Sequence, residues 1–329
     1  MSGPWIRCAS CPPSKPAAMS SRELIVLGTS SQVPTRARNH NSLFLMWDEL
    51  GILFDPGEGT QRQMVMAGLT ASQITHIAIT HFHGDHCLGL AGTIQRISLD
   101  RVPHAVEVIY PAGGQHFFER LRYASAYFDC AKLTPRPICA EPGGAEIAVT
   151  RAGRFRILAR PLEHGMECYG YRLQEDDGVR MLPEKLAAAG LKGAAVGELM
   201  KRGRIEIGDR MIEVGEVSEP RRGQSFAIVM DTRPCAGAAA LAQGVDLLVS
   251  EATYLTSEAT DAHDHYHMTA AGAARLARDA GARRLVLTHF SQRYTQLEPF
   301  AVEAGAVHPD VHVCDDLTRV PVPKRETPT

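Results

Sequence analysis

The feature that most constrains this chain is a histidine-rich cluster at residues 81–86. An apolar run at residues 77–79 directly precedes it and predicts a short buried strand, and an apolar helical pattern follows from Leu88. A turn from strand to helix can aim the first two histidines at one position and the remaining two groups at a second position nearby. Imidazole and carboxylate suit a borderline divalent ion such as zinc, whereas the alternative interpretation is a histidine-rich surface loop. The cluster comprises His81, His83, Asp85 and His86.

The spacing His-x-His-x-Asp-His is similar to the signature of the metallo-β-lactamase fold. The flanking segments resemble one branch of that superfamily, ribonuclease Z, the endonuclease that trims the 3′ trailer from precursor tRNA. Matching segments run in the family's order from about residue 23 to 294, and each lies at the end of a predicted strand. They are residues 34–39, with Arg36 in place of Lys; 55–63, with Pro56 in place of Cys; 231–235; 250–253, with Ser250 in place of His; 266–269; and 288–294.

The resemblance implies an α/β fold, the four-layer αβ/βα sandwich of the metallo-β-lactamases. Two sheets would face each other, helices would cover both outer sides, and the ligands would converge at one edge. We expect residues 22–323 to form this hydrolase domain. Residues 174–224, rich in charge and glycine, would contain an inserted arm. The Pro/Ser-rich residues 1–21 are expected to be a disordered tail, with Met19 as a candidate start, and residues 324–329 a second tail.

The resemblance also implies a ligand set for two zinc ions, although the sequence does not exclude Mn²⁺ or Fe²⁺. One ion would take His81, His83 and His164, the other would take Asp85, His86 and His289, and Asp231 would be shared. Asp55 ends a predicted strand, and a carboxylate there is suited to hold a ligating histidine by its other ring nitrogen.

The catalytic roles follow from this site. A metal-bound hydroxide would attack the phosphodiester, leaving a 3′-hydroxyl on the tRNA and a 5′-phosphate on the trailer. Asp85 would orient the water, and His267, oriented by Glu251, would protonate the leaving oxygen. The run His263-x-His265-x-His267 resembles a metal triplet, but only His267 lies where the family has a catalytic histidine.

Two segments predict contacts with RNA. The loop at residues 28–39 combines small polar residues with two arginines, a chemistry that suits phosphate. The family's equivalent loop contacts substrate near the cut, which assigns Arg36, Arg38 and Asn39 to substrate binding. The arm lacks the Gly-Pro-rich motif of many bacterial members but keeps a basic cluster. The resemblance implies that this cluster binds the tRNA elbow. In the family's homodimer, the arm of one subunit reaches the tRNA held by the other subunit. That cluster is Lys192, Lys201, Arg202 and Arg204.

Composition limits the remaining choices. The net charge of −2 gives no global sign of nucleic-acid binding, so any RNA site must be local. The eight cysteines are scattered and form no disulfide framework, which favours a reducing cytoplasm. Neither a transmembrane run nor a signal peptide is recognisable, so we expect a cytoplasmic protein without a membrane partner.

Three alternative functions stay open from the sequence. The first is another hydrolase on the same scaffold, such as a small phosphodiesterase, a sulfatase-like enzyme or a thioesterase, because fold alone does not set the substrate. The second is a non-catalytic RNA-binding protein, which the complete ligand set argues against. The third is a redox-active di-iron protein, which metal analysis would reveal.

Overall fold

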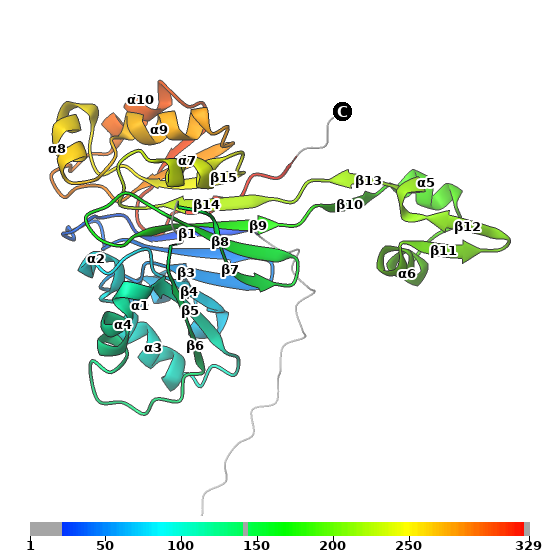
Figure 1. The fold of residues 1–329 in the computed structure, drawn as a ribbon, viewed down its shortest axis with the longest axis horizontal. Helices are drawn as coiled ribbons and strands as arrows, with labels where there is room; N and C mark the ends of the chain where they lie inside the picture. The colour runs from blue at the N-terminus through cyan, green and yellow to red at the C-terminus, as the bar shows by residue number, and fades with distance from the viewer. Residues whose placement is uncertain (1–21, 141–143, 326–329) are drawn as a thin grey trace, which may run out of the picture.

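Two mixed β-sheets form the body of the molecule in the computed structural model, which describes residues 22–140 and 144–325 (Figure 1). The predicted tail at residues 1–21 lies outside the described residues. Within the described ranges the first sheet has seven strands, β18 (Arg319–Pro321), β1 (Glu23–Gly28), β2 (Ser42–Trp47), β3 (Leu50–Phe54), β4 (His76–Ala78), β5 (Val106–Pro111) and β6 (Leu133–Ile138), in that order. Strands β3 to β6 run parallel, and the others are antiparallel.

The second sheet also has seven strands in the part of the chain that the structure describes. Their order is β17 (Val311–Val313), β16 (Arg284–Thr288), β15 (Leu247–Glu251), β14 (Ser225–Val229), β9 (Tyr169–Glu175), β8 (Phe155–Pro161) and β7 (Ile147–Ala152). Strands β14 to β17 are parallel, so their carboxyl ends meet at one edge of the sheet. The antiparallel turn from β8 to β9 lies at the same edge, because β9 pairs antiparallel with β14.

The two sheets pack face to face through large apolar side chains. Phe54 of the first sheet lies 6.2 Å from the Tyr171 ring and 5.6 Å from the Phe226 ring of the second, measured between ring centroids. Helices α1 (Thr60–Met66), α3 (Leu90–Leu99) and α4 (Gln115–Arg122) cover the outer face of the first sheet. Helices α7 (Ala236–Ala242), α9 (Ala270–Asp279) and α10 (Glu298–Gly305) cover that of the second. The predicted αβ/βα sandwich is therefore confirmed.

Shorter elements complete the body. Helix α2 (Gly84–Cys87) follows β4, and α8 (Ala259–Asp264) precedes α9. Single 3₁₀ turns occur at Ala71–Gln73, Ala112–Gly114, Val214–Glu216 and Thr256–Glu258. No helix in the described ranges is both long enough and apolar enough to cross a lipid bilayer.

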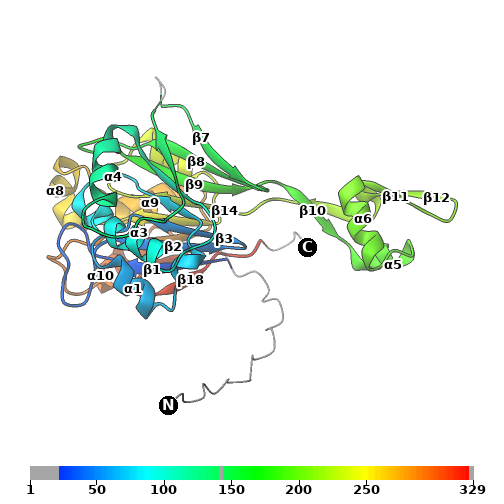
Figure 2. The ribbon, with the colours of Figure 1, turned by 90° about the horizontal axis from the view of Figure 1, so that it is seen from below.

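An arm projects from the body between β9 and β14 (Figures 1 and 2). Its stalk is an antiparallel ribbon of β10 (Gly178–Met181) and β13 (Ser218–Arg221). Its tip holds α5 (Pro183–Ala188), α6 (Ala194–Arg202) and a second ribbon of β11 (Arg204–Ile207) and β12 (Arg210–Glu213). The tip has its own small core around Leu191, Leu199, Ile212 and Val217. Within the arm, a helical pattern at residues 183–189 can be recognised in the sequence, whereas α6 and the two ribbons have no clear local pattern.

Candidate metal centre

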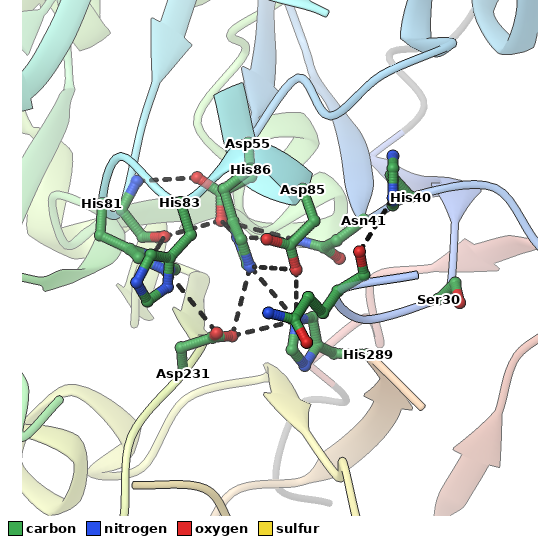
Figure 3. A network of polar contacts seen from close by, with 12 residues as sticks. Ser30, His40, Asn41, Asp55, His81, His83, Asp85, His86, Asp231 and His289 are labelled. Carbon is green, nitrogen blue, oxygen red and sulfur yellow. Dashed lines mark hydrogen bonds and ion pairs between the residues drawn. The ribbon is translucent and has the colours of Figure 1, made fainter. Parts of the chain in front are cut away.

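The histidines and aspartates of the predicted ligand set converge at one edge of the sandwich (Figure 3). This edge is where the parallel strands end, so side chains that directly follow each strand meet there. The cluster at residues 81–86 follows β4 and enters α2, Asp231 follows β14, and His289 follows β16. His164 lies in the turn from β8 to β9 at the same edge.

The first group brings three histidines against one carboxylate. His83 Nδ1 lies 3.0 Å from His81 Nε2 and 3.2 Å from His164 Nε2. Asp231 Oδ2 lies 3.6 Å from His81 Nε2 and 4.0 Å from His164 Nε2. These four residues can together offer one ligand atom each to a single ion.

The second group faces the other oxygen of the same carboxylate. His86 Nε2 lies 3.2 Å from His289 Nε2, and Asp85 Oδ2 lies 3.4 Å from the first and 3.5 Å from the second of these nitrogens. Asp231 Oδ1 lies 3.4 Å from His86 Nε2 and 3.2 Å from His289 Nε2. Asp231 therefore stands between the two groups with one oxygen toward each.

These contacts fit a divalent metal. Two ligands at about 2.0–2.1 Å from a tetrahedral ion lie roughly 3.3–3.4 Å apart. The donor atoms of the second group match this spacing, at 3.2–3.5 Å, and those of the first group bracket it, at 3.0–4.0 Å. Asp231 Oδ1 is buried and accepts no hydrogen bond within the described residues. A buried carboxylate oxygen without a donor is costly, and a cation between the groups would satisfy it.

The protonation states differ between the two groups. Burial, reinforced by the neighbouring His86, lowers the pKa of His81 well below its usual value, which keeps the ring neutral. Burial opposes ionisation of Asp231, but the facing His289 and His86 outweigh it and hold the pKa of this carboxyl well below its usual value. Burial lowers the pKa of His86, but the carboxylates of Asp231 and Asp85 outweigh burial and raise that pKa well above its usual value. Because a metal binds neutral imidazole, an ion in the second group would displace a proton from His86.

Asp55 orients His86 of the second group from the side opposite the centre. Its Oδ2 accepts a hydrogen bond of 2.8 Å from His86 Nδ1, which leaves His86 Nε2 facing the centre. The Thr80 backbone N–H donates to Asp55 Oδ1 at 2.7 Å, and the Thr80 hydroxyl donates to Oδ2 at 2.8 Å. Asp55 thus lies where the sequence places a partner for a ligating histidine, and it fixes the ring orientation of that histidine.

A fully buried carboxylate, Glu251, organises the other side of the centre. Its Oε1 accepts from His267 Nδ1 at 2.9 Å, and its Oε2 accepts from the Thr253 hydroxyl at 2.6 Å. Because the Thr253 hydroxyl donates its proton to Glu251, its oxygen accepts a hydrogen bond from His289 Nδ1 at 2.9 Å. Sequence reasoning missed Thr253, although it ends the segment 250–253 that resembles a family motif.

The surroundings of His267 favour its protonated, cationic form beside the centre. Burial lowers the pKa of His267, but the adjacent Glu251 carboxylate outweighs burial and raises that pKa to about 9. Together with Asp231 and His289, His267 also forms a third group with metal-ligand spacing, so its role has two chemical interpretations. The other two histidines of the run 263–267 contact neighbours on their own segment, Asp264 and the carbonyl of Asp261.

A hollow of about 540 Å³ opens over both groups. His83, Asp85, His164, Asp231, His267 and His289 line its floor, and Gln32, Tyr254 and Arg293 are among its walls. The Arg293 guanidinium lies 4.9 Å from the centre of the Tyr254 ring and pairs with Asp261 at 3.0 Å. The hollow can therefore admit a phosphodiester to the centre.

Hydrogen bonds from Arg38 and Asn39 hold the loop at residues 34–39 against the body. Arg38 is only 5% exposed, and its guanidinium donates to the carbonyl oxygens of Ser291 and Tyr294 at 3.2 and 2.8 Å. These bonds tie the loop to the segment after His289, and the prediction that Arg38 binds substrate phosphate stays a prediction. The Asn39 side chain is also occupied, donating to the Glu58 carbonyl oxygen at 2.7 Å.

The other predicted RNA contacts lie apart from the metal centre. Arg36 is exposed, but it lines a separate hollow with Arg62. The four basic residues of the arm, Lys192, Lys201, Arg202 and Arg204, are all exposed at its tip. They face solvent on or beside α6 and β11, and Arg202 pairs with Glu198 on the same helix.

A matched pair of variants tests the Thr253 contact. Thr253→Val keeps the shape of the side chain but removes the hydroxyl, so His289 loses the group that fixes its ring. We expect metal affinity to fall by roughly 10–100-fold, the usual effect of losing such a partner. Zinc titration of the metal-free chain measures this, and Thr253→Ser, which keeps the hydroxyl, should restore most of the affinity. Equal affinity in all three proteins would contradict the assignment.

Comparison with known proteins agrees with this geometry. A family model described as "Beta-lactamase superfamily domain" matches residues 212–290, and one described as "Anti-Pycsar protein Apyc1" matches residues 22–109. A protein of Streptomyces coelicolor named Ribonuclease Z is 58% identical over 309 residues, covering 93% of this chain and 100% of the relative. The Ribonuclease Z of Chlamydia trachomatis serovar L2 is 44% identical and covers 93% of this chain and 99% of the relative.

Solved structures show the same fold. The short form of human tRNase Z superposes with a TM-score of 0.68 at 24% identity, covering 92% of this chain and 100% of that one. The metallo-β-lactamase fold protein YhfI of Bacillus subtilis superposes with a TM-score of 0.64 at 17% identity, with 92% and 100% covered. At these identities the likeness concerns the fold.

Proposed function

We propose that this chain, which belongs to the ribonuclease Z family of the metallo-β-lactamase superfamily, removes the 3′ trailer from precursor tRNA. It is a metal-dependent hydrolase of the endoribonuclease type. The observation that carries the proposal is the convergence of the two donor groups and the Glu251–His267 pair under one hollow, in a chain 58% identical to a Ribonuclease Z over its length. The proposed products are tRNA with a 3′-hydroxyl and a trailer with a 5′-phosphate.

Two zinc ions are the proposed cofactors. His81, His83 and His164 would hold one, Asp85, His86 and His289 the other, and Asp231 both. Bound in this way, a pair of divalent ions supplies a hydroxide nucleophile near neutral pH and neutralises charge on the attacking and leaving oxygens.

The chain's own residues would manage the protons. Burial raises the pKa of Asp85, but His86 and His289 outweigh burial and hold the pKa of that carboxyl well below its usual value. An ionised Asp85 can accept a hydrogen bond from the attacking water and orient it. His267 is held by Glu251 at Nδ1, so its Nε2–H is free to protonate the leaving oxygen.

The arm suggests how the RNA body is held. Strands β9 and β14 each have one end at the metal edge and the other at the arm, so the arm points away from the metal centre of its own chain (Figure 2). We propose a homodimer in which the tip of one subunit grips the tRNA whose 3′ end lies in the centre of the other. Residues 22–323 would be the hydrolase domain, with residues 174–224 as its RNA-binding arm. The described cysteines are free thiols, which suits the proposed cytoplasmic location.

Cleavage of an end-labelled precursor tRNA by the zinc-loaded protein tests the proposal. Bis(p-nitrophenyl) phosphate, assayed in parallel, reports the metal chemistry alone. A single cut after the discriminator base, absent in Asp85→Ala, is the expected result. Turnover of the small diester without any cut in the RNA would overturn the tRNA assignment and favour a small-molecule phosphodiesterase on the same scaffold.

A further inference from the structure

A large hollow lies where the arm leaves the body, far from the metal edge. Its volume is about 860 Å³, and its wall comes from separate parts of the chain: the residue before β1, the turn from β7 to β8, the arm stalk and the segment after β18. We call it the basic saddle because six of its lining side chains are cationic: Arg22, Arg154, Arg221, Arg222, Lys324 and Arg325. Its lining carboxylate, Glu23, pairs with Arg319 at 2.7 Å.

Two buried carboxylates hold the inner side of the saddle. Arg22 pairs with Asp48 at 2.6 Å and with Glu175 at 2.7 Å. Arg154 pairs with Asp48 at 2.9 Å, and Arg221 pairs with Glu175 at 2.7 Å. Both carboxylate side chains are almost fully buried, whereas those of Arg154 and Arg221 are 53% and 36% exposed. Three guanidinium groups thus share two carboxylates, and positive charge faces the solvent.

On the outer side of the saddle, fewer carboxylates neutralise the cationic side chains. Arg325 pairs with Asp246 at 2.8 Å, but Arg283 shares the same carboxylate at 2.9 Å. Arg222 and Lys324 are exposed, and neither forms an ion pair with any residue in the described ranges. A chain with a net charge of −2 therefore concentrates positive charge at this one place, which creates a local field that attracts anions.

The position of the saddle limits what it binds. Strand β9, with seven residues, separates the arm root from the metal edge, a span of roughly 20 Å. An anion in the saddle is therefore not the phosphate being cleaved in the same chain. The saddle lies at the base of the stalk whose tip carries the exposed basic cluster. The arm that joins the two sites projects from the body at this end (Figures 1 and 2).

We propose that the basic saddle binds the phosphodiester backbone of the RNA whose body the arm tip holds. This inference rests on the proposed function. A wall of cations drawn from separate elements suits several phosphates along a strand, since each cation can pair with a different one. Inorganic polyphosphate shares this chemistry, and the experiment below separates the two ligands.

The test uses the two exposed and unpaired cations. Arg222→Ala/Lys324→Ala removes two charges without breaking an ion pair that the structure shows. Arg120→Ala/Arg275→Ala removes two exposed arginines from α4 and α9 and serves as the control of equal charge change. Binding of a fluorescein-labelled tRNA transcript without a trailer, which offers nothing to cleave, is followed by anisotropy over a series of salt concentrations.

We expect the saddle variant to bind tRNA about tenfold more weakly than the wild type. The slope of log affinity against log salt concentration should fall by roughly 1–2, since about one counterion is released per phosphate contact. The control variant should stay within about twofold of the wild type. Unchanged affinity and slope in the saddle variant would overturn the proposal.

Inorganic triphosphate distinguishes the ligand. Calorimetric binding of triphosphate that disappears in the saddle variant, with tRNA affinity unchanged, would make the saddle a small-anion site and overturn the RNA assignment. The proposed function fails separately: a wild-type protein that binds tRNA through the saddle but cuts no precursor would refute tRNA processing and leave the saddle assignment standing.

Discussion

Asp231→Ala should lose most of its bound metal and at least about 10³-fold in turnover. Asp231 places one oxygen toward each donor group, and its buried Oδ1 has no hydrogen-bond donor within the described residues. Without this carboxylate, five imidazoles and Asp85 must hold two cations alone. Charge stabilisation by metal ions is worth several kcal/mol in such reactions, which sets the scale of the loss. Metal content by mass spectrometry and hydrolysis of bis(p-nitrophenyl) phosphate measure the two effects.

Asp264→Ala is the matched control for this prediction. It removes the same carboxylate from an exposed position on α8, where the neighbouring contact is His263 on the solvent side. This variant should keep wild-type metal content and rate. If Asp231→Ala kept full metal content with a normal rate, the role of Asp231 as a shared ligand would be refuted.

His267→Ala should lower the rate by roughly 10²–10⁴-fold and leave the metal content unchanged. The expected loss is that of a general acid, since the Nε2–H of His267 is the proposed proton source for the leaving oxygen. A leaving group that needs no proton depends little on this residue. The defect should therefore be large for RNA and much smaller for bis(p-nitrophenyl) phosphate, whose nitrophenolate leaves unprotonated.

The comparison with His263→Ala isolates this effect. His263 belongs to the same histidine run but its side chain is 69% exposed and contacts Asp264. Its removal should change neither rate nor metal content. Loss of metal from His267→Ala would instead make His267 a ligand in the third group, with Asp231 and His289, and refute its role as an acid.

Strand ends explain why so much of the metal centre could be predicted. The parallel strands of both sheets end at one edge, so a histidine or aspartate directly after an apolar run is brought to that edge by the topology itself. The position of His164 after a strand is not enough to predict it as a ligand, because a single histidine forms no spacing motif. Its assignment rests on the family resemblance, because His164 followed by Tyr-Gly-Tyr-Arg at residues 169–172 is similar to the family's third ligand motif.

Side-chain direction explains what could not be predicted. Arg38 stands in a loop whose composition suits phosphate, yet its guanidinium turns inward to carbonyls more than 250 positions later in the chain. Thr253 shows the reverse case, since nothing in its local sequence indicates that its hydroxyl lies between Glu251 and His289. Both outcomes depend on long-range packing.

The arm and its root also depend on long-range packing, which limits what the sequence predicts there. Its helices and ribbons are short, with four to nine residues each, and a shared tip core stabilises them more than any strong local pattern does. The basic saddle is assembled from positions as far apart as 22, 154, 222 and 325. No local charge count along the sequence reveals it.

The arm tip is a packing unit of its own. Leu191, Leu199, Ile212 and Val217 pack among themselves and with tip residues, and none belongs to the clusters that hold the two sheets together. Substitutions in this core should therefore disturb the tip and leave the catalytic edge folded.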